Sequence, residues 1–158
     1  MENESNILIS TGDKQLAFEV GAQSYAIDTG AVREIRGWTE LSGMPHADPH
    51  LMGVINLRGE MLPLLGLAAK LGLQTPEINE RSVIIIVEEQ EAVFGLLVDS
   101  VSNIIAPPAE DVKPPPEAAK SGVAAYVSAL TLVEDNLTRI LDVSALLNAS
   151  QPLLVEAS

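Results

Sequence analysis

The chain has 158 residues, of which 47% are apolar, and a net charge of −13 from nine Lys and Arg against 22 Asp and Glu. This length suits one domain, or two small intertwined ones, with a buried core. The absence of cysteine excludes disulfides, thiolate catalysis and cysteine-based zinc sites. The negative charge disfavours nucleic acid as a partner, because the surface would repel a phosphate backbone.

The two ends of the chain are polar or tail-like, and the N-terminal end does not resemble an export signal. The first five residues are Met-Glu-Asn-Glu-Ser, which lacks the basic and then apolar pattern of an export signal. The longest aliphatic run, Val83–Val87, is far shorter than the roughly 20 residues that span a membrane. We therefore expect a cytoplasmic protein with a flexible N-terminus at 1–13, a folded region at 14–148 and a C-terminal tail at 149–158.

The folded region begins with a predicted hairpin. Apolar and polar residues alternate over Lys14–Val20, which predicts a half-buried strand. A turn at Gly21–Ser24 leads into a return strand that starts with Tyr25–Ile27. The segment Ala31–Arg36 is predicted as a third strand, with a short helical turn as the alternative.

A second hairpin is predicted within Gly53–Leu67, where two short apolar strands meet at a bend over Asn56–Glu60. Gly59 suits the bend because glycine adopts positive φ without a steric penalty. Pro63 has no N–H to donate, which predicts a sheet edge or a break in the strand ladder. Arg58 lies at the bend, and it is either a hydrated surface charge or an anchor for a partner beside an apolar groove.

The next segments predict a short helix followed by more strands. The helix covers Leu67–Leu73 and ends at a glycine. The run Ser82–Val87 is almost wholly β-branched, which predicts a strand buried on both faces, and Ala92–Val98 is its partner across an acidic turn. The chain then continues extended to residue 105, with Val101 and Ile104 turned inward.

The last third predicts a loop and another hairpin. Five prolines between residues 106 and 116 indicate a stiff loop, and residues 122–142 contain two apolar strands joined at Glu134–Asn136. The whole pattern gives about nine or ten short strands without a βαβ rhythm. We therefore predict an all-β, barrel-like fold, for which two small barrels with a shared core are one arrangement.

A search for catalytic chemistry finds no nucleophile elbow, phosphate loop, dinucleotide fingerprint or zinc-protease helix. His46, Asp48 and His50 alternate in a loop and could in principle ligate a metal, but Pro49 interrupts the spacing and no further ligand is evident. Asp99 has no paired acid or base nearby and is interpreted as an exposed or capping residue. We expect no catalytic residue, metal or cofactor, and a binding function instead.

Several motifs resemble one known family. The run Gly53-Val-Ile-Asn-Leu-Arg-Gly59, an apolar-Pro-apolar strand and Leu67-Ala-Ala-Lys-Leu-Gly-Leu73 resemble the signature of CheW-type coupling proteins of bacterial chemotaxis. Val32–Gly37 is similar to that family's apolar-x-Glu-Ile element, and Gly95–Val101 to its second diagnostic run. The ordered set extends over roughly Leu16 to Leu147.

This resemblance implies an all-β fold of two intertwined SH3-like five-stranded β-barrels with one or two short helices. It implies a non-enzymatic adaptor that bridges the cytoplasmic tip of chemoreceptors and the regulatory domain of the chemotaxis histidine kinase. Such a protein works in the cytoplasm at membrane-associated receptor arrays without inserting into the membrane, and it can associate weakly with itself in array rings.

The resemblance also implies two sets of site residues. The receptor-binding set is Arg58, Gly59, Gly53, Val83, Val101 and Ile104. The kinase-binding set is Leu16, Val32, Glu34 and Ile35.

Two positions depart from the family pattern. Gly66 stands where an acidic or amide residue usually precedes the helix, so the helix would lack its side-chain cap. Thr29 replaces an aliphatic residue near the kinase-binding face. These departures leave open a CheW-like paralogue in another pathway, such as surface sensing or pilus motility. A generic peptide-binding β-barrel is a further alternative.

Overall fold

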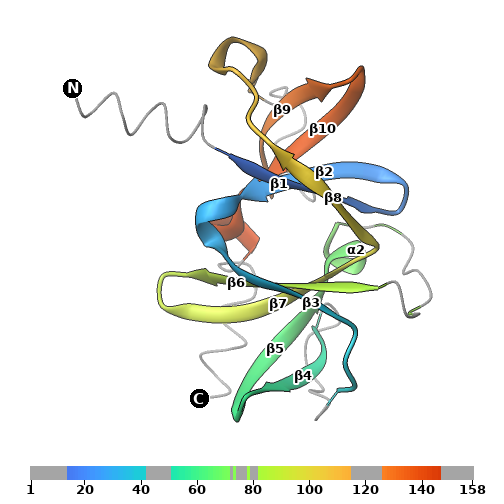
Figure 1. Cartoon of the computed structure of the whole chain (residues 1–158), viewed down its shortest axis with the longest axis vertical. Coiled ribbons are helices and arrows are strands. Elements are labelled where there is room, and N and C mark those ends of the chain that lie inside the picture. Colours follow the sequence, from blue (N-terminus) through green and yellow to red (C-terminus); the bar gives the residue numbers. More distant parts are fainter. Residues whose placement is uncertain are drawn as a thin grey trace.

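The computed structural model of the chain describes residues 14–41, 51–71, 73, 78, 82–114 and 126–146. These residues form ten strands in two five-stranded sheets, with two short α-helices and two 3-10 turns (Figure 1). No helix among them is long and apolar enough to cross a membrane. The predicted fold class, all-β with two intertwined five-stranded barrels, is confirmed.

The first barrel combines strands from both ends of the described chain. Its strand order is β8-β1-β2-β10-β9, in which β10 runs parallel to β2 and the other neighbours are antiparallel. The strands are β1 (Gln15–Val20), β2 (Gln23–Asp28), β8 (Ser100–Ile105), β9 (Val127–Val133) and β10 (Asn136–Leu141).

The second barrel is one continuous stretch of chain inserted between β2 and β8. Its strand order is β3-β6-β7-β5-β4, so β3 and β4 are its edge strands. The strands are β3 (Val32–Gly37), β4 (Leu51–Leu57), β5 (Glu60–Gly66), β6 (Val83–Glu89) and β7 (Ala92–Val98). Three short elements complete the labelled fold, namely η1 (Thr29–Ala31), α2 (Leu67–Lys70) and η2 (Ala109–Asp111).

The first hairpin is tighter than predicted. Its turn consists of Gly21 and Ala22, both with positive φ, and β2 already begins at Gln23. The Gly21 N–H donates to Oδ2 of Asp99 over 2.9 Å. Asp99 thus braces the turn, which confirms that it acts as a capping residue. Likewise, the strand predicted at Ala31–Arg36 is present as β3, and a helical turn, η1, immediately precedes it.

Two sequence-based expectations about β5 and α2 are met. β5 is an inner strand of its sheet, but its pairing with β7 begins only at Leu64. Pro63 therefore lies in the half of β5 that pairs only with β4. Its missing N–H interrupts no hydrogen bonds between β5 and β7. At the start of α2, the N-cap residue Gly66 makes no side-chain hydrogen bond.

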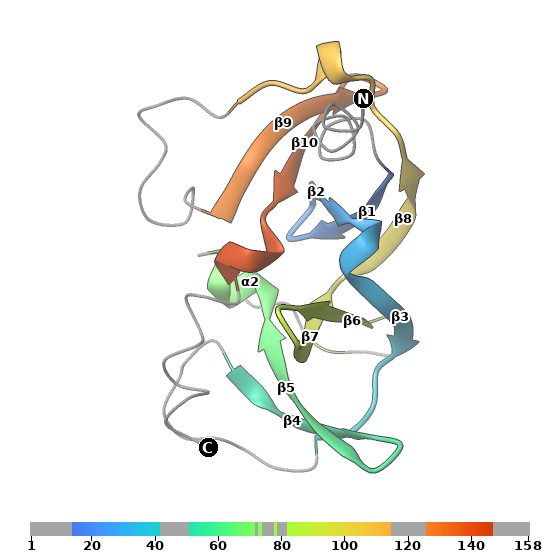
Figure 2. The ribbon, with the colours of Figure 1, turned by 90° about the vertical axis from the view of Figure 1, so that its left-hand side faces the viewer.

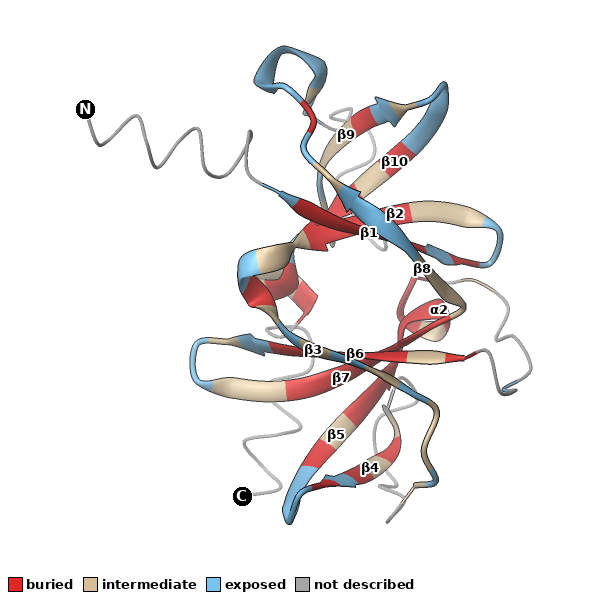
Figure 3. Cartoon of the chain, in the orientation of Figure 1, coloured by how far each residue is buried: buried red, intermediate tan, exposed pale blue. Residues whose placement is uncertain are grey.

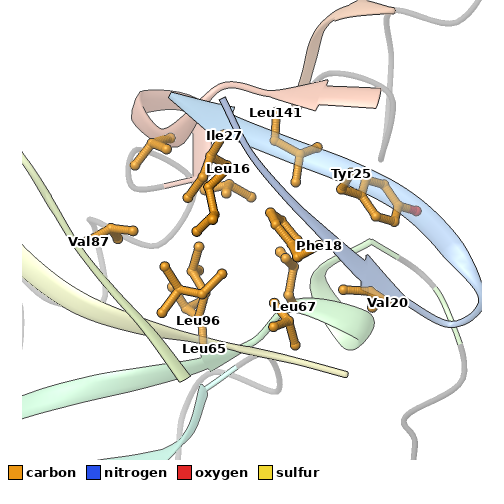
Figure 4. Close-up of a cluster of buried hydrophobic side chains, with 14 of the residues drawn as sticks. Leu16, Phe18, Val20, Tyr25, Ile27, Leu65, Leu67, Val87, Leu96 and Leu141 are labelled. Atoms are coloured by element: carbon orange, nitrogen blue, oxygen red, sulfur yellow. The ribbon is translucent and has the colours of Figure 1, made fainter. Parts of the chain in front are cut away.

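The two sheets pack against each other through one shared core (Figure 4). Phe18 and Ile27 come from the first sheet, whereas Leu65 and Leu96 come from the second, and all four belong to the same buried cluster. A smaller cluster lies wholly within the second barrel and contains Ile55, Leu57, Leu62, Leu64, Ile84, Ile86 and Leu97. The buried residues concentrate where the barrels meet, while the hairpin tips are exposed (Figure 3).

The strand β6 contributes side chains to both cores, as its β-branched sequence predicts. Ile85 and Val87 belong to the shared core, and Ile84 and Ile86 belong to the core of the second barrel. Successive side chains of a strand point to opposite faces, so a strand between two cores must be apolar on both.

The first barrel is closed by backbone hydrogen bonds. Lys113, which follows the edge strand β8, exchanges two backbone bonds of 2.8 and 2.7 Å with Leu130 on the other edge strand, β9. The hydroxyl of Thr131 also donates to the carbonyl of Asp111 over 3.0 Å. The chain after β8 thus bridges the two edges of the sheet.

Other sequence-based interpretations differ from the structure or lie outside it. Val101 does pack against the shared core, but the prediction that Ile104 is turned inward is wrong, because the residue is 57% exposed. β8 is an edge strand, so a side chain on it is covered from one side only. The alternating His46, Asp48 and His50 lie outside the described residues, as do the predicted N-terminal segment and C-terminal tail.

Candidate docking surface

The turn between β4 and β5 presents Arg58 to solvent. Arg58 and Gly59 both have positive φ, at 51° and 88°, which is the pattern of a two-residue hairpin turn. The side-chain oxygen of Asn56 accepts the Gly59 N–H over 2.9 Å and fixes the turn. The Arg58 side chain is 68% exposed. A Cβ added at Gly59 would meet no atom within 4 Å, so the surface beside Arg58 is open.

Arg58 is held by an ion pair with Glu34 on β3. Its Nη2 donates to Oε1 of Glu34 over 2.7 Å, and Nη1 of Arg36 donates to the other carboxylate oxygen over 3.1 Å. β3 is one edge of the second sheet, and the turn that carries Arg58 follows the other edge, β4. The ion pair therefore links the two edges of this sheet.

Each partner of this ion pair favours the charged form of the other. The hydrogen bond from Arg58, followed by that from Arg36, lowers the pKa of the Glu34 carboxyl below its usual value of 4.5. The same hydrogen bond from Arg58 to Glu34 raises the pKa of Arg58. Because the pair lies at the surface, solvent screens it and its contribution to stability is small.

The structure places the other residues of the expected receptor-binding set in different environments. Gly53 is buried in β4 and pairs with Leu64. Val83 on β6 and Val101 on β8 are half-buried and pack against the shared core. Ile104 pairs with Leu16 and extends the apolar surface of β1 to the exposed rim of the sheet.

The expected kinase-binding set is also divided by exposure. Ile35 is 47% exposed on β3, and Val32 is half-buried against the shared core. Leu16 is only 4% exposed and belongs to the shared core, so its side chain does not reach this surface. Glu34, from this set, pairs directly with Arg58, from the receptor-binding set. The strands β3 and β8 lie on the same side of the molecule, one above the other (Figures 1 and 2).

The family can now be identified from comparison with known proteins. The family model of the CheW-like domain matches residues 14–151. The chain belongs to the CheW-like family. The Chemotaxis protein CheW of Rhizobium meliloti (strain 1021) is 37% identical to this CheW-like chain over 145 residues, which is 92% of this chain and 94% of that protein.

One solved structure and one more distant relative complete the comparison. The crystal structure of scaffolding protein TtCheW from Thermoanaerobacter tengcongensis matches with a TM-score of 0.73 and 27% identity, over 82% of this chain and 83% of that one. Protein PilI of Pseudomonas aeruginosa is 27% identical over 86 residues, which is 54% of this chain and 48% of that protein.

Sequence reasoning missed one member of the charged cluster in this CheW-like chain. Arg36 lies two residues after Glu34 on a predicted strand, so the two side chains share a face. That spacing was sufficient to suggest the second ion pair, which measures 3.1 Å. The divergent Thr29 lies in η1, half-buried, and its N–H donates to the carbonyl of Lys14 over 3.1 Å.

Proposed function

We propose that this chain is a non-enzymatic scaffold that couples chemoreceptors to the chemotaxis histidine kinase. The match of the CheW-like domain over residues 14–151 carries the proposal, and the likeness to the Rhizobium chemotaxis protein and to the TtCheW scaffold supports it. In this role the chain works in the cytoplasm and joins receptor arrays at the membrane through its partners.

The receptor contact is proposed to centre on Arg58. A guanidinium carries five N–H donors in a rigid fork, and the ion pair with Glu34 uses only one side of it. The remaining donors face solvent next to the open surface of Gly59. They suit the carboxylate and carbonyl oxygens of a receptor's helical hairpin, while Gly53, Val83, Val101 and Ile104 supply the framework and apolar border.

The kinase contact is proposed to lie on the edge strand β3. An edge strand offers unpaired backbone groups to another barrel, and the exposed Ile35 adds an apolar side chain that can anchor it. Val32 lies at the base of this face, Leu16 supports it from the shared core, and Glu34 orders it through its two arginine partners.

The test compares two variants that break the same ion pair. Arg58→Gln removes the cation that would contact the receptor, whereas Glu34→Gln leaves that cation in place. Binding to a chemoreceptor signalling tip and to the kinase regulatory domain, both from the same organism, is measured by calorimetry. We expect the wild type to bind both. Arg58→Gln should weaken receptor binding about tenfold or more, in line with an interfacial arginine hot spot, and Glu34→Gln should affect it much less.

Two results would count against this proposal at different levels. Equal loss of receptor binding in both variants would mean that Arg58 acts only by closing the barrel. If the wild type binds neither target, the coupling role fails. Binding to the receptor and kinase of a pilus-motility or surface-sensing pathway instead would then favour the paralogue.

A further inference from the structure

A cavity of about 500 Å³ lies where η1, the end of β10 and the segment 143–146 meet, and it is partly open to solvent. It is separate from the surface formed by β3 and the β4–β5 turn. The described residues that line it are Gln15, Asp28, Gly30, Ala31, Glu89, Ser128, Ile140, Leu141, Asp142, Val143 and Ser144.

The lining offers hydrogen-bond acceptors and negative charge. It carries three carboxylates, from Asp28, Glu89 and Asp142, and none of the described lining residues is Lys, Arg or His. Both hydroxyls already donate within the protein, because Ser128 Oγ bonds the Ile140 carbonyl over 3.2 Å and Ser144 Oγ bonds Glu89 over 2.9 Å. A ligand with N–H donors and positive charge would therefore complement this lining.

Each carboxylate uses only part of its acceptor capacity in the fold. Oδ1 of Asp28 accepts the Gly30 N–H over 2.9 Å, Oδ1 of Asp142 accepts the Ala145 N–H over 3.3 Å, and Oε2 of Glu89 accepts the Ser144 hydroxyl. These bonds fix the direction of the carboxylates. An ionised carboxylate has about four lone-pair sites, so each retains capacity for a ligand.

Gln15 is the independent observation that points to a ligand. Gln15 is only 3% exposed, and its Oε1 is buried without a hydrogen-bond partner, while the residue itself is one of those that line the cavity. Leaving a buried acceptor unsatisfied costs about 1–3 kcal/mol. A ligand donor that meets Oε1 when the Gln15 amide turns into the cavity would remove this penalty.

We propose that this cavity binds a guanidinium group. The three carboxylates come from three separate elements, and no group of His, Cys, Asp or Glu among the described residues is close enough to hold a metal ion. Acceptors on separate elements that are not grouped for a metal ion suit a planar cation with several N–H donors better than a point charge. The group belongs either to an arginine side chain of a partner protein or to a small free guanidino compound.

The test is an NMR titration of the ¹⁵N-labelled full chain at 150 mM salt. The probes are N-acetyl-arginine-methylamide, the matching citrulline compound, which is its neutral isostere, and the matching lysine compound. We expect the arginine probe to give saturable shifts at the lining residues, the lysine probe to bind at least threefold more weakly, and the citrulline probe to give no saturable shift. Free arginine and an arginine tripeptide, titrated in parallel, distinguish the small-molecule source from the side-chain source.

Matched charge variants distinguish binding in the cavity from nonspecific attraction of the probe to the acidic surface. Asp28→Asn with Glu89→Gln removes two charges from the lining but keeps an oxygen acceptor at each position. Glu134→Gln with Asp135→Asn removes two charges from the β9–β10 turn, which does not line the cavity. We expect the first pair to weaken binding of the arginine probe at least tenfold and the second pair less than twofold. Gln15→Met, which removes the buried acceptor at similar volume, should weaken it at least threefold.

Three outcomes would overturn the inference. The first is shifts that spread over the acidic surface without saturation. The second is equal weakening by the two pairs of charge variants, and the third is saturable binding of the citrulline probe. This inference stands apart from the proposed coupling function, because the probes involve neither a receptor nor a kinase.

Discussion

Glu34 and Arg58, joined by a 2.7 Å hydrogen bond, connect the two edges of the second five-stranded sheet. The first sheet is closed differently, by backbone bonds between Lys113 and Leu130. A backbone bridge does not depend on ionisation, whereas an ion pair does. The second barrel, which carries Arg58 at its edge, is therefore the one whose closure responds to pH and salt.

Stability of this barrel should depend on the charge of Glu34. In the folded state the pKa of the Glu34 carboxyl lies below its usual value of 4.5. As the pH falls below 4.5, the unfolded chain is therefore protonated at Glu34 before the folded chain is. The contribution of Glu34 is thus complete above pH 4.5 and is lost as the pH falls through the lowered pKa. We expect the stability difference between the wild type and Glu34→Gln to shrink over that range, measured by urea unfolding at a series of pH values.

Salt provides the control for this experiment. High salt screens a surface ion pair. At neutral pH it should therefore also reduce the difference in free energy of unfolding between the wild type and Glu34→Gln. If the free energy of unfolding depends on pH in the same way for the wild type and Glu34→Gln, the ion pair does not contribute to folding stability.

The shared core predicts that the two barrels unfold together. Phe18 on β1 is fully buried in that core, and Phe→Ala in such a site typically costs about 3–5 kcal/mol. Trp38, the single tryptophan of the sequence, packs against the core of the second barrel. We expect Phe18→Ala, a change in the first barrel, to shift the denaturation midpoint seen by Trp38 fluorescence as far as the midpoint seen by far-UV circular dichroism.

Ile55→Ala is the matched change within the second barrel's own core, where Ile55 is also fully buried. In a cooperative unit it too should move both signals together. If Phe18→Ala leaves the Trp38 transition unmoved, the barrels are independent folding units.

Local sequence pattern was enough to predict most of the fold. Leu16, Phe18 and Val20 recur at every second position, and the strand they predict is β1, although five of its six residues are buried and the predicted half-burial is wrong. The β-branched run in β6 predicted burial on both faces, and the structure supplies a core on each. Such signals are local, since side-chain period and turn chemistry depend on a few consecutive residues.

What the sequence did not reveal depends on contacts between distant segments. Ile104 has an apolar side chain, but its exposure follows from the edge position of β8, which only the sheet order defines. Gln15, Glu89 and Asp142 line one cavity although they are far apart in sequence. The Glu34–Arg58 pair likewise joins residues 24 positions apart. No residue pattern within one segment contains this information.

Close packing around β7 predicts that even Gly95→Ala destabilises the fold. A Cβ there would lie 3.0 Å from Ile84 Cγ2 and 3.1 Å from Leu64 Cδ1, inside the core of the second barrel. Overpacking of this kind typically costs about 1–3 kcal/mol. At Gly37 on β3 a Cβ would meet nothing within 4 Å. We expect Gly95→Ala to lower the urea midpoint and Gly37→Ala to leave it unchanged or slightly raised, and equal effects would refute this packing argument.

The proposed kinase-binding face predicts the effect of a charge at Ile35. Ile35 is 47% exposed on the edge strand β3, so Ile35→Asp should change the free energy of unfolding by less than about 0.5 kcal/mol. If Ile35 anchors the kinase regulatory domain, the same change should weaken that binding about tenfold or more while leaving receptor binding intact. Leu132→Asp is the control, since Leu132 is an exposed aliphatic residue on β9 of the other barrel. Calorimetric titrations that show equal loss for the two variants, or no loss for Ile35→Asp, would remove β3 from the kinase contact.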